Sequence, residues 1–121
     1  MFSCGDNSSG SSIPDLTSAD KIELMYKSGF DSSGKMGVKT IDITDRNEIF
    51  KIAHTVSSEP FSYQYCISTG SMTFYKNGSV MMTLVYNTSD DYRHIAYSTD
   101  SKLTAVKLSE ENARLLEKYM Q

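Results

Sequence analysis

Apolar and polar residues alternate over residues 21–27. This period of two predicts a β-strand, because successive side chains of a strand point to opposite faces. A helix capped by Thr17 or Ser18 is the competing interpretation. A second alternating stretch, 36–43, follows a Gly- and Ser-rich segment at 28–35. We expect a loop at 28–35 and a hairpin between the two strands.

Five further stretches carry a strand pattern, and Asn77-Gly78 is the strongest hairpin signal among their links. Thr69-Gly70 is expected to be a turn. A two-residue turn at Asn77-Gly78 would place Tyr75 opposite Val80 and Phe74 opposite Met81. Both faces of this hairpin are then apolar, which predicts a central position in the sheet. The five stretches are 61–67, 71–76, 79–86, 92–98 and 103–108.

The apolar period becomes helical in two places. The first predicted helix covers about 45–57, where Asp45 and Glu48 approximate a capping box. The second begins after Ser109, a good N-cap residue, and Glu110 lies at its positive end. The expected buried positions are Ile49, Ile52, Ala53 and Val56 in the first helix, and Ala113, Leu116 and Met120, helped by Leu115 and Tyr119, in the second.

These elements predict an α+β fold of two layers, in the order β-β-α-β-β-β-β-α. Four consecutive strands out of the five stretches, joined by short links, would form an antiparallel meander, and two amphipathic helices would cover one of its faces. Residues 1–13 are too rich in Ser and Gly to build a core, so we expect a flexible tether there and a single domain over 14–121.

The composition narrows the possible functions. The chain has 121 residues, 39% of them hydrophobic, with a formal charge of −3 and a pI near 5.3. This charge disfavours nucleic-acid binding. Two Cys and two His argue against a disulfide-stapled fold and a four-ligand zinc site. No apolar run reaches the length of about 18 residues that a membrane helix needs. We expect neither a metal nor another cofactor.

Few residues could carry catalysis. Cys66 with His54 or His94 is the only pairing of a nucleophile and a base, and Cys66 has no helix N-terminus or Gly-rich turn to activate it. A structural thiol and packed or capping histidines explain these residues better. Asp90-Asp91 lacks the spacing of a Ca²⁺ loop. We therefore expect no enzymatic activity.

The segment Met1-Phe2-Ser3-Cys4-Gly5 resembles the processing site of a bacterial lipoprotein. In that family a small residue precedes the cysteine that receives the lipid, and a polar tether follows it. Ser3 matches the small position and Cys4 the lipidated one, whereas Met1 stands where Leu is usual. The resemblance implies an extracytoplasmic protein, periplasmic or in the cell envelope, held to a membrane through a lipid on Cys4.

Seven Met and eight Tyr in a chain without Trp favour a contact surface, because both residue types are enriched at protein interfaces. We expect a protein partner, on a monomer or homodimer, and small immunity lipoproteins that occlude a toxin are similar in kind. One alternative is a ligand-binding or enzymatic cleft near Cys66 and His94; another is a structural accessory lipoprotein of an envelope complex. The expected contact residues are either Phe74, Met72 and Met81 or Tyr75, Met82 and Leu84, depending on which sheet face the helices leave uncovered. Tyr92 is a further candidate, and the carboxylates expected at the rim are Asp90, Asp91, Asp100, Glu110 and Glu111.

Overall fold

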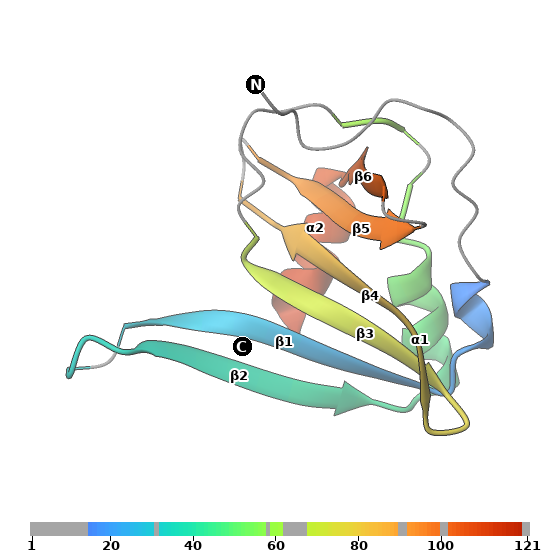
Figure 1. The fold of residues 1–121 in the computed structure, drawn as a ribbon, viewed down its shortest axis with the longest axis horizontal. Coiled ribbons are helices and arrows are strands. Elements are labelled where there is room, and N and C mark those ends of the chain that lie inside the picture. The colour runs from blue at the N-terminus through green and yellow to red at the C-terminus, as the bar shows by residue number, and fades with distance from the viewer. Residues whose placement is uncertain are drawn as a thin grey trace.

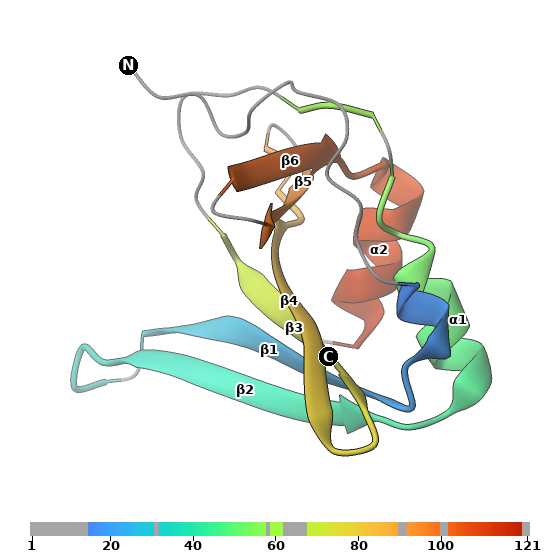
Figure 2. The ribbon, with the colours of Figure 1, turned by 45° about the vertical axis from the view of Figure 1, so that its right-hand side comes forward.

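The computed structural model describes residues 15–30, 32–57, 59–61, 68–89, 92–99 and 102–119. It is an α+β fold, in which a six-stranded antiparallel sheet carries two helices on one side (Figures 1 and 2). The elements are η1 (Leu16–Ser18), β1 (Lys21–Phe30), β2 (Met36–Ile43), α1 (Arg46–Ala53), β3 (Gly70–Lys76), β4 (Ser79–Asn87), β5 (His94–Thr99), β6 (Lys102–Lys107) and α2 (Glu110–Lys118).

The four strands after α1 form the expected antiparallel meander, but a meander does not describe the whole sheet. Its strand order is β2-β1-β3-β4-β5-β6, so β1 lies between β2 and β3 and pairs with both. The chain leaves β2 at the sheet edge, passes through α1 in the helical layer and returns as β3 beside β1. A pattern of local hydrophobicity cannot show this return, because the β1–β3 pairing joins residues about 50 positions apart.

The first hairpin confirms the alternation over 21–27. Its apolar positions Ile22, Leu24 and Tyr26 are all buried, and the helical interpretation is wrong. β1 pairs with β2 from Ile22 opposite Ile43 to Phe30 opposite Met36, so the strands take up part of the expected loop. Because β3 pairs with β1 only over residues 21–26, the far end of the hairpin reaches beyond the rest of the sheet (Figure 1).

The β3–β4 hairpin confirms the turn and its central position but corrects its register. Asn77 and Gly78 have φ of 53° and 80°, as the tight turn requires. Tyr75 lies opposite Val80 as expected, but Phe74 lies opposite Met82. Met81 is therefore the extra residue of a β-bulge, which moves every later residue of β4 to the other face.

Gly70 is not in a turn but begins β3, between Tyr26 on β1 and Tyr86 on β4. The Tyr86 side chain lies over this glycine, and its hydroxyl donates to the Met25 carbonyl at 3.3 Å. A Cβ at position 70 would lie 2.5 Å from Tyr86 Cζ and closer still to the Met25 oxygen. Only glycine fits beneath Tyr86.

The helix caps follow the sequence. Asp45 Oδ1 accepts hydrogen bonds from the backbone N–H groups of Asn47 and Glu48, at 2.8 and 3.1 Å. Ser109 Oγ accepts from the backbone N–H of Asn112 at 3.1 Å. α1 ends at Ala53, earlier than the predicted 57, with His54 as its C-cap.

The core lies between the helices and one face of the sheet. Phe74, Met72, Met82, Leu84 and Tyr86 line its sheet side, and Ile49, Ile52, Ala113 and Leu116 line its helical side. These helix positions match the predicted stripes. The tether at 1–13, most of the expected strand at 61–67, and both cysteines lie outside the described residues.

Candidate functional site: the open face of the sheet

The sheet has one face covered by α1 and α2 and another that no described helix covers. The helices lie behind the sheet in Figure 1, so the second face is turned towards the viewer. We call its part on β1–β4 the open face. Its residues, taken from the strand registers, are Lys21, Glu23, Met25, Lys27, Val38, Thr40, Asp42, Ser71, Thr73, Tyr75, Val80 and Thr83.

Apolar side chains on the open face are unusually accessible for a sheet. Met25, Val38 and Val80 are 39%, 54% and 58% exposed, and Tyr75 is half-buried. They come from all four strands of the face. Tyr75 and Val80 are cross-strand partners, which places them side by side.

The polar residues of the open face are held in place by their neighbours. Lys21 Nζ lies 5.0 Å from the centroid of the Tyr75 ring and 3.9 Å from Asp42 Oδ2. The hydroxyls of Thr73 and Thr83 are 3.3 Å apart across β3 and β4. The open face therefore combines accessible apolar side chains with polar groups that contact one another.

The far end of the same face is covered. There Phe61 packs against Ala96, Ala105 and Val85, and its ring stacks on His94 with centroids 4.9 Å apart. The Phe61 backbone N–H donates to the Ala105 carbonyl at 3.0 Å, and Pro60 forms a bridge with Val106. Residues 59–61 thus extend the sheet beyond β6 and close this end of the face.

The structure separates the expected contact residues. Tyr75 lies on the open face, whereas Phe74 and Met72 are fully buried under the helices, so their assignment to a contact surface is wrong. Met81, in the bulge, is half-buried against the core cluster. Tyr92 is exposed just before β5, away from the open face, and Asp90, Asp91 and Asp100 lie outside the described residues.

Two other expectations concern charge and catalysis. Glu110 and Glu111 begin α2, so they lie on the helical side of the sheet and not at the rim of the open face. His94 is packed, as expected: its ring is buried and Nδ1 donates to the Tyr92 carbonyl at 2.6 Å. Because Cys66 is outside the described residues, a cleft between Cys66 and His94 stays a prediction.

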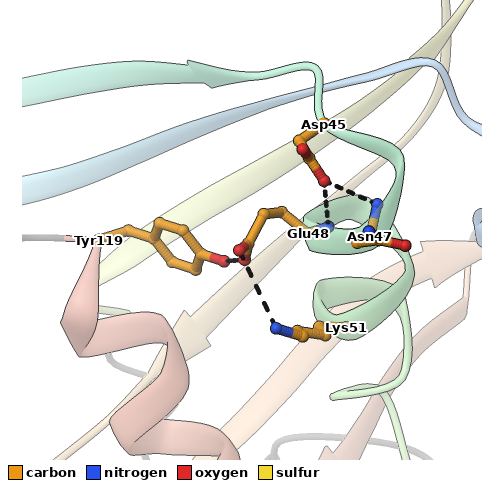
Figure 3. A network of polar contacts seen from close by, with 5 residues as sticks. All are labelled: Asp45, Asn47, Glu48, Lys51 and Tyr119. Carbon is orange, nitrogen blue, oxygen red and sulfur yellow. Dashed lines mark hydrogen bonds and ion pairs between the residues drawn. The ribbon is translucent and has the colours of Figure 1, made fainter.

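A groove lies between the two helices, on the other side of the sheet from the open face. Phe50, Lys51 and His54 of the α1 segment and Glu111, Leu115 and Lys118 of α2 line a groove of about 550 Å³. Near it the Tyr119 hydroxyl donates to Glu48, which also forms an ion pair with Lys51 at 4.0 Å (Figure 3). This network joins the end of α2 to the first turn of α1.

The sequence analysis did not identify Phe50 as a functional candidate, because it falls outside the predicted apolar stripe of α1. A large apolar residue at a position outside that stripe was the signal that could have identified it.

The described residues offer little for catalysis or metal binding. Among them no three His, Cys, Asp or Glu side chains gather into a possible metal site. Burial raises the pKa of Tyr86 and of Tyr97, and hydrogen bonds from Thr17 lower the pKa of Asp15; none of these residues belongs to the open face. No helix in the described ranges is both long and apolar enough to span a bilayer.

Comparisons of the chain with protein-family models, with curated proteins and with solved structures found no match.

Proposed function

We propose that this chain is a non-enzymatic binding protein that takes a protein partner on the open face. One observation carries the proposal: Met25, Val38, Val80 and Tyr75 are accessible on a sheet face whose opposite side forms the core. Tyr75 is the proposed anchor, because it is the aromatic residue among those named for the open face and a few aromatic residues supply most of the binding energy of an interface.

The partner we propose is a secreted toxin, which the protein neutralises by occlusion in the manner of an immunity lipoprotein. A lipid on Cys4 would hold it in the periplasm or cell envelope. The Cys4 pattern with its polar tether supports the anchor. The net charge of −3 supports association with a basic toxin surface, because complementary charge speeds encounter.

Site-specific photo-crosslinking tests the surface. A photoreactive residue replaces Tyr75 in one variant and Glu117 in a control, both in cells that make the anchored protein. Glu117 is exposed on α2, away from the open face. We expect a crosslinked partner from position 75 and none from position 117. A partner captured from position 117 alone would place the interface on the helices.

A functional assay then tests the role of the partner. If the captured protein is a toxin, the wild-type chain should inhibit it at equal concentration, and Tyr75→Asp should lose inhibition while remaining folded at the assay temperature, as a thermal unfolding curve shows. A captured structural protein of the envelope would favour the accessory alternative. Mass spectrometry of Cys4 in the membrane fraction tests the anchor, with Cys4→Ser as the control.

A further inference from the structure

The groove between α1 and α2 is lined by both apolar and basic residues. Phe50 and Leu115 supply the apolar surface, and Phe50 is 55% exposed although it sits in the middle of α1. Its ring contacts the His54 ring, with centroids 4.1 Å apart. The volume of about 550 Å³ falls within the range of small-molecule sites.

The polar groups around the groove have an uneven charge. Lys51, Arg114 and Lys118 line it, against one carboxylate, Glu111. Glu111 lies two turns before Lys118 on α2 and so lies away from the Lys118 end of the groove. Lys118 therefore has no carboxylate of the groove lining beside it.

These three cations differ in how strongly a neighbouring carboxylate already pairs with them. Arg114 forms a close ion pair with Glu110 at 2.6 Å. Lys51 is only at the limit of an ion pair with Glu48, at 4.0 Å, and Glu48 already accepts from Tyr119. Lys118 forms no ion pair with the residues that the structure describes. Lys51 and Lys118 are the two groups that can take a further anion.

The geometry points to a small amphipathic anion as the ligand of this groove, and we propose an acyl-chain carboxylate. Its chain would lie on Phe50 and Leu115, and its carboxylate would pair with Lys118 and Lys51. A charge-assisted contact at one end and apolar burial along the rest would orient it. This site is on the helical side of the sheet and is independent of the partner proposed for the open face.

Titration of the wild-type chain with dodecanoate, followed by amide NMR shifts, tests the class of ligand. Dodecyltrimethylammonium, which has the same chain and the opposite charge, is the control, and both probes stay below the concentrations at which they aggregate. We expect shifts in α1 and α2 with dodecanoate and binding at least about tenfold weaker with the cation. Equal binding of both probes, or shifts confined to the open face, would overturn the proposal.

Variants test the two parts of the site. Phe50→Ser and Lys118→Glu should each weaken dodecanoate binding by about tenfold or more. Leu103→Ser, a similar loss of an exposed apolar side chain on β6, and Lys39→Glu, the same charge reversal on β2, should leave it unchanged. Unfolding midpoints show that each variant is folded. Loss of binding in the control variants as well as in the groove variants would refute the assignment, and so would unchanged binding in all four variants. Binding to vesicles of anionic lipid without binding of the monomeric probe would also refute it.

Discussion

The two faces of β3 and β4 are built from neighbouring residues but differ in how they are packed. Phe74 is completely buried beneath the helices, whereas Tyr75, the next residue, lies half-buried on the open face. On the covered face large apolar residues from every strand meet in one cluster. On the open face, apolar residues are separated by Thr, Ser and charged side chains. Large buried area and tight packing are typical of a core, whereas accessible apolar area among polar groups is the property on which the proposed contact surface rests.

The largest effect that separates the two faces should come from truncating their aromatic residues. Phe74→Ala leaves a cavity in the core and should destabilise the fold by about 3–5 kcal/mol. Tyr75→Ala removes a half-buried side chain and should cost about 1 kcal/mol or less. Chemical denaturation of both variants measures the difference. Similar large losses from both would mean that the open face is packed in solution.

A methyl group at Gly70 should be the next largest perturbation. The new Cβ would meet both Tyr86 and the Met25 carbonyl, so strands β1 and β4 would have to move. We expect Gly70→Ala to cost about 1–3 kcal/mol, as overpacking does. Ser71→Ala, one residue later on the open face, is the matched control and should change stability by about 0.5 kcal/mol or less. Equal stabilities of the two variants would show that Tyr86 can leave its place over Gly70.

Much of the fold was predictable because its signals are local. The alternation in β1, the Asp45 and Ser109 caps and the Asn77-Gly78 turn each depend on residues within a few positions, and all were confirmed. The bulge was not predictable from the same rules. Met81 and Met82 are identical residues, so hydrophobicity alone cannot say which of the two faces the core.

The candidate site was predictable only in outline. The sequence indicated apolar residues on both faces of the β3–β4 hairpin, but the register error grouped Met81 with Phe74 and left the exposed face undecided. Val80 was correctly placed opposite Tyr75, but Met25 and Val38 were not identified, because their exposure depends on where α1 and α2 pack. The pairing of β1 with β3 completes the face, and this pairing joins residues that are distant in sequence.

The turn that joins the two strands should respond to a β-branched residue. Gly78 has a φ of 80°, a region that costs residues with a Cβ about 1–2 kcal/mol and more for branched ones. Gly78→Val should therefore lower the free energy of unfolding by at least about 1 kcal/mol. Nothing lies within 4 Å of the position of a Cβ there, so the cost would be one of backbone strain alone. Gly78→Asn, which tolerates positive φ better, should lose less; an equal loss would argue against strain.

The smallest predicted effect is a dependence of stability on alkaline pH that arises on the covered side. Burial raises the pKa of Tyr86 above its usual value of 10. The folded protein therefore holds the proton of Tyr86 at pH values where the unfolded chain releases it. The contribution of this group to stability is complete below pH 10 and is lost as the pH rises above 10. At pH 10.5 the loss due to Tyr86 should be about 0.8 kcal/mol.

Tyr86→Phe isolates this contribution. The variant also loses the hydrogen bond to the Met25 carbonyl, so it should be less stable than the wild type at pH 7. The decisive quantity is the change in unfolding free energy between pH 7 and pH 10.5. That change should be smaller in Tyr86→Phe than in the wild type by about 0.8 kcal/mol, because Phe cannot ionise when the chain unfolds. An identical change in both proteins would mean that Tyr86 can reach water without global unfolding, and that the covered face opens beside Gly70.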